Sequence, residues 1–161
     1  MVSRPVRKRI RLPLASYEQG NAFFITISTY RRHSWFGLHT ELAAEAQRFL
    51  SELSFERGSR VYAWCIMPDH VHLLLQDPAV VDFVRLFKGR LTPRATRFEP
   101  GEKMWQRSFH DHGLRKEETL EGVARYIWEN PVRKGLVAHA TEYNWSGSEV
   151  WSNWRDFFGR G

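Results

Sequence analysis

The fold is decided by the stretch VYAWCIMPDHVHLLLQ, residues 61–76, in which two apolar runs flank a short turn. The runs 61–67 and 70–76 are rich in aliphatic, aromatic and β-branched residues, which favours two strands. Pro68 and Asp69 lie between them and favour a tight turn, because proline fixes its own φ and donates no hydrogen bond. The stretch therefore predicts a pair of antiparallel strands.

Upstream of this hairpin the pattern changes from strand to helix. Residues 23–29 alternate with a period near two and predict a strand. Residues 40–58 carry an apolar stripe with helical spacing, preceded by Thr40 as a candidate N-cap and closed by Gly58 as a stop signal.

Downstream the pattern predicts two helices and one strand. We expect a helix that begins at Val80 and that Pro93 ends, because proline breaks the helical hydrogen-bond ladder. A strand over 104–110 and a third helix over 117–130, stopped by Pro131, complete the series.

This order of elements predicts an α+β, ferredoxin-like fold: a βαββαβ antiparallel sheet with both helices on one face, plus an additional C-terminal helix. In that topology the strand over 70–76 is central. Its odd-numbered residues are all aliphatic and should face the helices, because side chains alternate along a strand. Its even-numbered residues, which include His70 and His72, then face a side that is free for function.

The 161 residues suit one domain, which we divide into a basic arm (1–16), the main domain (17–140) and a C-terminal tail (141–161) without a clean period. No apolar run approaches the length of a membrane span, and the N-terminal residues do not resemble a secretory signal. Cys65 is the only cysteine, which excludes an internal disulfide. We therefore expect a cytoplasmic protein without a membrane partner.

The charge balance indicates an anionic partner. The chain carries 24 Lys and Arg against 18 Asp and Glu, a net charge of +6. Nucleic acid fits better than a membrane surface, because prolines interrupt the arm and it shows no amphipathic stripe. A solvated tail is the alternative. The excess is concentrated in the arm, at Arg4, Arg7, Lys8, Arg9 and Arg11.

Two histidines and one helix carry the candidate chemistry. His70 and His72 are two apart on a strand, so their side chains share a face, with Cα atoms about 6.6 Å apart. Without thiolates, such a pair suits a divalent ion that also takes oxygen ligands. Tyr126 and Asn130 are i, i+4 neighbours off the apolar stripe of the third helix, and the asparagine amide is a candidate third ligand. The alternatives are a chance pair of surface histidines, a half-buried tyrosine and an ordinary helix end.

Other residues compete for roles at this site. His110 and His112 form a second pair with the same spacing, which could bind the metal or touch DNA, although the first pair lies nearer the middle of the sheet. Seven tryptophans are many for this length. They are candidates for stacking on unpaired bases, but a core role is the interpretation that we favour. The tryptophans in question are Trp35, Trp105 and Trp145, and the basic residues that flank the site and could hold phosphates are Arg31, Arg32, Arg133 and Lys134.

The segments WCIMPDHVHLLL (64–75) and YIWENPVRKGLV (126–137), with WQRSFHDH (105–112) and YNWS (143–146), resemble the single-tyrosine HUH transposases, specifically the REP-associated tyrosine transposases. The family's histidine, hydrophobic, histidine motif falls on His70 to His72, and its nucleophile falls on Tyr126. Its third metal ligand falls on Asn130, where related insertion-sequence enzymes often carry glutamine. The family's fold is the ferredoxin-like sheet.

The resemblance implies metal-dependent cleavage and joining of single-stranded DNA beside a REP-type hairpin. Tyr126 would attack the phosphate, forming a 5′-phosphotyrosine and releasing a 3′-hydroxyl. Mg²⁺ or Mn²⁺, held by His70, His72 and Asn130, would polarise the phosphate. The molecule would act as a monomer or a homodimer.

Two alternatives remain at this point. One is a non-catalytic, RRM-like module that binds single-stranded nucleic acid, although such a module would carry aromatic residues where this chain has His70 and His72. The other is a domesticated relative that binds its hairpin but no longer moves DNA.

Overall fold

The computed structural model describes residues 21–159. The basic arm, with Arg4, Arg7, Lys8, Arg9 and Arg11, lies outside the described residues. No helix within 21–159 is long and apolar enough to cross a membrane.

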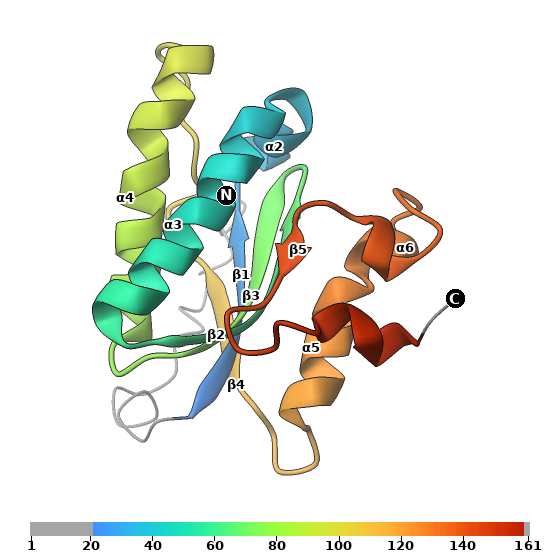
Figure 1. The fold of residues 1–161 in the computed structure, drawn as a ribbon. Helices are drawn as coiled ribbons and strands as arrows, with labels where there is room; N and C mark the ends of the chain where they lie inside the picture. The colour runs from blue at the N-terminus through green and yellow to red at the C-terminus, as the bar shows by residue number, and fades with distance from the viewer. Residues whose placement is uncertain (1–20, 160–161) are drawn as a thin grey trace, which may run out of the picture.

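A single antiparallel sheet forms the centre of the molecule, with strand order β4-β1-β3-β2-β5 (Figure 1). The predicted hairpin supplies β2 and β3, and β3 pairs with β1 as expected for the ferredoxin-like topology. Thr26 of β1 lies opposite His72 on one side and His110 of β4 on the other. The strands are β1 (Ala22–Ser28), β2 (Arg60–Met67), β3 (His70–Gln76), β4 (His110–Gly113) and β5 (Ser146–Gly147).

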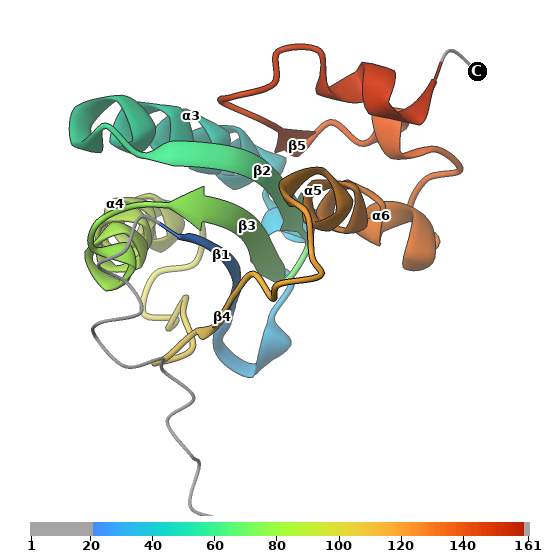
Figure 2. The ribbon, with the colours of Figure 1, turned by 90° about the horizontal axis from the view of Figure 1, so that it is seen from below.

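Two long helices, α3 (Thr40–Arg57) and α4 (Val80–Phe98), cover one face of the sheet, and the short α2 (Trp35–Leu38) precedes them. Figure 2, which looks along the strands, shows α3 and α4 on one side of the sheet and α5 and α6 on the other. The odd-numbered residues of β3 belong to the core beneath α3 and α4, as the alternation predicts. This confirms the α+β fold and the direction in which β3 faces.

The opposite face is not free, contrary to the prediction. Helix α5 (Leu120–Trp128) packs over β2 and β3, and its apolar stripe forms a second core with Leu74. The face remains open beside β1 and β4, where a pocket lies between these strands and α5. A short helix, α6 (Asn130–Arg133), follows directly.

The segment after residue 140 packs on α5. It contains the 3₁₀ helices η2 (Ala140–Glu142) and η3 (Trp154–Phe158), and β5 adds a short edge strand to β2. The ring of Trp128 contacts four aromatic rings of this segment. Gly147 is required at β5, because a Cβ there would lie 2.3 Å from the Trp64 ring. The C-terminal segment therefore holds α5 against the sheet.

One of the two proline predictions is wrong. Pro93 lies inside α4, which continues to Phe98. The buried residues Leu91 and Ala95, on either side of it, stabilise the helix and offset the hydrogen bond that proline cannot make. The third helix does stop before Pro131, but it ends at Trp128 and not at residue 130. Pro131 lies in the first turn of the next helix, α6, where its missing N–H costs no helical hydrogen bond.

Three element starts also differ from the prediction. The strand expected over 104–110 is instead an irregular segment with one bridge, Thr29 to Trp105, and β4 begins only at His110. The helix expected from 117 begins at Leu120, because the Thr119 side chain accepts a hydrogen bond from the backbone N–H of Gly122 and caps it. Likewise α3 begins at Thr40, with His39 in the cap position.

Candidate functional site

The predicted histidine pair exists, and both imidazoles are oriented by neighbours. The Nε2 atoms of His70 and His72 lie 3.1 Å apart. His70 Nδ1 is 2.6 Å from a carboxylate oxygen of Asp69, and His72 Nδ1 is 3.0 Å from the hydroxyl of Thr26. Because the carboxylate accepts the proton of Nδ1, the Nε2 of His70 carries a lone pair. This is the arrangement by which proteins orient metal-binding histidines.

Burial favours the uncharged form of both histidines. Burial lowers the pKa of His70, and the Asp69 carboxylate only partly offsets this effect. Burial is the main cause that lowers the pKa of His72 to about 3, and the charge that His70 would carry when protonated and the charge of Arg133 act in the same direction. For Asp69, burial acts to raise the pKa, but the hydrogen bond from His70 and the charge of Arg32 bring it below its ordinary value. Neutral imidazole is the form that binds metal ions.

Asn130 completes the set at the start of α6. Its side chain is buried, and Nδ2 lies 3.3 Å from His70 Nε2. The two ends of an amide are nearly identical in shape, so a half-turn of the side chain presents the oxygen at the same place. The structure thus brings together the three predicted ligands, His70, His72 and Asn130.

These donors fit a divalent ion. Two nitrogens bound to one ion at about 2.1 Å and at right angles are about 3.0 Å apart, close to the separation of the two Nε2 atoms. Within residues 21–159 no group of three or more His, Cys, Asp or Glu is placed to hold an ion. The Asn130 amide lies beside the pair and could serve as a third ligand, and two imidazoles with one amide oxygen suit Mg²⁺ or Mn²⁺.

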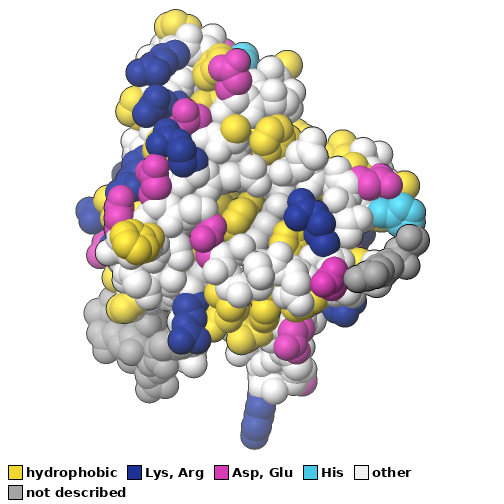
Figure 3. Space-filling view, in the orientation of Figure 1, with side chains coloured by type: hydrophobic (Ala, Val, Ile, Leu, Met, Phe, Trp, Pro, Cys, Tyr) yellow, Lys and Arg dark blue, Asp and Glu magenta, His cyan; other side chains and the backbone are white. Residues whose placement is uncertain are grey.

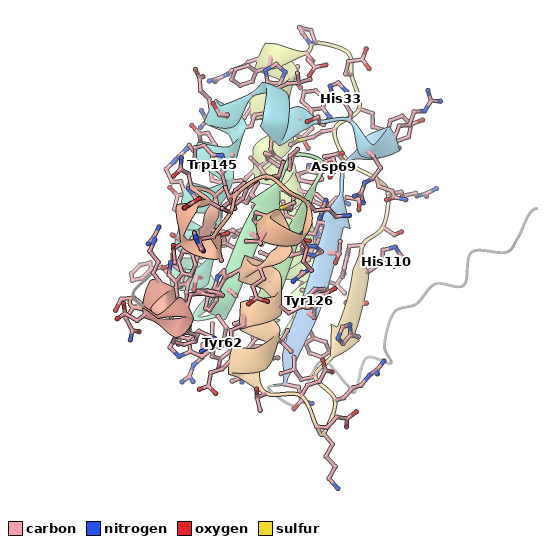
Figure 4. The ribbon with its side chains drawn as sticks, turned by 90° about the vertical axis from the view of Figure 1, so that its right-hand side faces the viewer. His33, Tyr62, Asp69, His110, Tyr126 and Trp145 are labelled. Atoms are coloured by element: carbon pink, nitrogen blue, oxygen red, sulfur yellow. The ribbon has the colours of Figure 1, made fainter. Side chains whose placement is uncertain are left out.

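Tyr126 faces the same space from α5. The residue is 54% exposed and lines a pocket of about 740 Å³ together with His72. The Phe24 ring lies between them, 6.0 Å from the Tyr126 ring and 5.4 Å from the His72 ring, centre to centre. Gly122, one turn before Tyr126, lines this pocket and adds no side chain beside the ring. Figure 4 shows Tyr126 on the helix that crosses in front of the sheet.

Arg133 holds the tyrosine ring. Its guanidinium carbon lies 3.9 Å from the centre of the Tyr126 ring, and Nη2 donates a 2.7 Å hydrogen bond to the Tyr126 carbonyl oxygen. The contact joins α6 to α5 and places a positive charge over the phenol. Arg133 is thus beside the site, as predicted.

Of the two predicted basic residues Arg31 and Arg32, only Arg32 contacts the histidine site. Both have left-handed backbone, with φ of 54° and 57°, a conformation that costs free energy in residues other than glycine and is often found at functional sites. Arg32 uses it to donate to Asp69 over 3.0 Å and to reach within 3.2 Å of His70 Nδ1. Arg31 instead lies over the Tyr30 ring.

A second, smaller pocket of about 220 Å³ lies on the His70 side of the pair. Arg32, Lys134 and Asp69 line it with His70, so the predicted Lys134 is also at the site. The arginines of α3 and α4, in contrast, are interleaved with acids, as Figure 3 shows along that edge. The ion pairs there include Arg90 with Glu56 and Arg85 with Asp82.

The competing residues take other places. His112 stacks on Phe24, with ring centres 5.2 Å apart, and lines the larger pocket, whereas His110 lines neither this pocket nor the smaller one beside His70. Trp35 and Trp105 are buried and Trp145 packs on the same core, so the core interpretation of these tryptophans is confirmed.

Three residues of the site were not predicted from the sequence: Phe24, Thr26 and Asp69. Phe24 and Thr26 alternate along β1 and therefore share a face, but only the register with β3 places that face beside His72. Asp69 was assigned to the turn alone, and its carboxylate also reaches His70.

Comparison with known proteins gives a consistent result. A family model described as "Transposase IS200 like" matches residues 16–130. A Haemophilus influenzae protein named for the REP-associated tyrosine transposases is 33% identical over 98 residues, which cover 52% of this chain and 56% of that protein. The chain thus spans little more than half of that relative. The REP-associated tyrosine transposase of Escherichia coli K12 is 23% identical over 130 residues, covering 81% of this chain and 78% of that one.

A solved structure shares the fold. It is a REP-associated tyrosine transposase bound to a REP hairpin, with a TM-score of 0.65 and 21% identity, covering 88% of this chain and 86% of that chain.

Proposed function

The chain belongs to the IS200-like transposase family, and from that premise we propose that it cleaves and rejoins single-stranded DNA beside a hairpin, through a covalent bond between Tyr126 and a 5′ phosphate. The observation that carries the proposal is the pocket that Tyr126 and His72 share. A nucleophile and a metal-binding histidine face one space, within one chain. One protomer therefore supplies both parts of the reaction, which supports activity as a monomer.

Tyr126 supplies the nucleophile. Its phenolic oxygen attacks the phosphorus and loses its proton, the new ester bond to tyrosine forms, and the bond to the 3′ oxygen breaks, so that this oxygen leaves and takes a proton. One phosphodiester replaces another, which makes the step reversible and requires no nucleotide cofactor. Rejoining is the same exchange with a different 3′-hydroxyl.

Phenols are almost entirely protonated at neutral pH, so the site has to favour the charge that develops. Arg133 places a guanidinium over the Tyr126 ring, and Arg32 and Lys134 line the second pocket, where they can hold phosphate oxygens. A Mg²⁺ or Mn²⁺ ion held by His70, His72 and Asn130 would supply Lewis-acid polarisation of the phosphate when bound.

The partner class follows from the solved relative, which is bound to a REP hairpin. We extend this class to the chain: a DNA hairpin with a single-stranded flank, held in part by the basic residues of the arm. An RRM-like binding role is less well supported, because α5 covers the β2 and β3 surface on which such a module would stack bases.

The test is incubation of the protein with labelled hairpin DNA and Mg²⁺ or Mn²⁺, followed by denaturing electrophoresis. Wild-type protein should form a covalent adduct and release a shorter strand with a free 3′-hydroxyl. Tyr126→Phe should bind the hairpin and form no adduct. An equal amount of adduct with Tyr126→Phe would refute the assignment, and hairpin binding by wild type without any adduct would favour the domesticated, binding-only alternative.

A further inference from the structure

The pocket beside Tyr126 is larger than the reacting groups require. Its volume of about 740 Å³ is in the range of pockets that enclose whole small molecules. The sheet supplies one side, with Phe24, His72 and His112, and α5 supplies the other, with Tyr126 and the bare backbone of Gly122. The space is therefore large enough for a nucleotide as well as the phosphate that reacts.

Charge separates this pocket from its neighbour. Among the described lining residues, Arg115 is the single Lys or Arg, and it is opposed by Glu117 and Glu118. The smaller pocket holds Arg32 and Lys134 against one acid, Asp69. Phosphates favour the positively charged pocket, whereas an uncharged nucleobase suits the larger one.

Aromatic surface marks the place of the base. Phe24 and His112 are cross-strand partners of β1 and β4, and their rings stack with an interplanar angle of 17°. The His112 side chain is 49% exposed. Its ring contacts Phe24, and its Nε2 lies 3.9 Å from a carboxylate oxygen of Glu118. A stacked, exposed ring beside a roomy pocket is the means by which proteins hold unpaired bases.

We propose that this pocket receives an unpaired nucleobase of the DNA strand, next to the phosphate that Tyr126 attacks, and that His112 is the residue on which the base stacks. The proposal rests on the proposed function. His72 lines the larger pocket and His70 the smaller one, so the two pockets meet at the histidine pair. A strand whose reacting phosphate lies at that pair has one adjacent base within reach of His112.

The experiment measures binding without covalent chemistry, in Tyr126→Phe protein. A DNA strand is first selected from a pool of hairpins with random single-stranded flanks, and a series of the same strand is made with one abasic position at a time. Affinity for each strand is then measured for His112→Ala, for His112→Phe, which keeps an aromatic ring, and for His110→Ala. The last is the matched control, because His110 lies on the same strand and the same face but outside the pocket.

We expect His112→Ala to weaken binding of the intact strand about tenfold, which is within the usual effect of losing one stacked base. At one abasic position the loss should disappear, since there is no base left to stack. His112→Phe should restore the affinity for the intact strand. His110→Ala should bind the intact strand and the strand with that abasic position as tightly as the Tyr126→Phe parent protein does.

An undiminished loss at every abasic position, or no loss on the intact strand, would overturn the proposal. The result also separates it from the proposed function. If the effect of His112→Ala disappears at one abasic position but wild-type protein forms no adduct on the same strand, the base site is supported and the cleavage reaction is refuted. If the parent protein binds no hairpin from the pool, both fall.

Discussion

Replacing Arg133 by alanine should slow the covalent step while sparing DNA affinity. Two contacts with Tyr126 are lost: the guanidinium over its ring at 3.9 Å, and the 2.7 Å hydrogen bond to its carbonyl oxygen. The third contact, with Glu129 at 4.0 Å, is a solvent-exposed ion pair that does not touch the tyrosine. A cation over an exposed ring contributes about 0.5–1 kcal/mol. The hydrogen bond contributes about 1 kcal/mol, the value of an ordinary hydrogen bond and below that of a buried charged donor, because the Arg133 side chain is 37% exposed. At about 1.4 kcal/mol for each tenfold change, the sum predicts a fall in rate of about 10- to 30-fold.

The assay is single-turnover adduct formation at saturating hairpin DNA, together with the dissociation constant in the Tyr126→Phe background. Arg133→Lys should fall between the two, because lysine keeps the charge but not the planar fork that bridges ring and carbonyl. Arg85→Ala is the control for net charge, because Arg85 lies on α4 with Asp82 as its partner.

The contrary result would be a weaker dissociation constant with an unchanged rate at saturation. Arg133 would then be a phosphate contact, and its position over the Tyr126 ring would have no part in the reaction.

Three further outcomes are expected. Deleting residues 1–13 should weaken hairpin affinity and flatten its dependence on salt, because fewer phosphates are contacted and fewer counterions are released on binding. An unchanged salt slope would exclude the arm as a DNA contact. His70→Ala, or EDTA added to wild-type protein, should abolish adduct formation and leave hairpin binding largely intact, and full activity after chelation would refute the metal site. Asp77→Asn should lower the free energy of unfolding at pH 7 by about 3 kcal/mol, since the buried carboxylate accepts two 2.9 Å hydrogen bonds from Arg57. Burial acts to raise the pKa of Asp77, but the hydrogen bonds from Arg57 and Ser59 bring it below its ordinary value. The wild-type advantage should therefore be complete above the unfolded-state pKa of about 4 and shrink as pH falls through the lower native value; a difference between the two proteins that stays constant in urea unfolding from pH 7 to pH 2 would contradict this.

The parts of the site that follow from local geometry were predictable from the sequence. A period of two fixes that His70 and His72 share a face, and the two residues lie where that period puts them, with Nε2 atoms 3.1 Å apart. The approach of Asn130 to His70 does not follow in the same way, because α5 ends at Trp128 and Asn130 begins α6, so the spacing from Tyr126 does not by itself bring the amide to the histidine.

The parts that depend on tertiary pairing were not predictable. The position of strand β4 depends on its pairing with β1, which places Phe24 opposite His112. The apolar residues before His110 do not indicate that the strand begins only at His110. The sheet face that should have been free is half covered, because the stripe of α5 needs an apolar partner and finds it at Leu74. Pro93 was predicted to end the helix because the hydrogen bond that a proline removes can be recognised in the sequence, whereas the tertiary packing that offsets this loss cannot.

The central claim is that Tyr126 becomes bonded to DNA. The most direct test is to digest the adduct formed by wild-type protein, hairpin DNA and Mn²⁺ with protease and nuclease, and to locate the nucleotide-modified peptide by mass spectrometry. The account predicts one modified residue, Tyr126, carrying a 5′-linked phosphate. Modification of a different residue, such as Tyr30 or Tyr143, would contradict it.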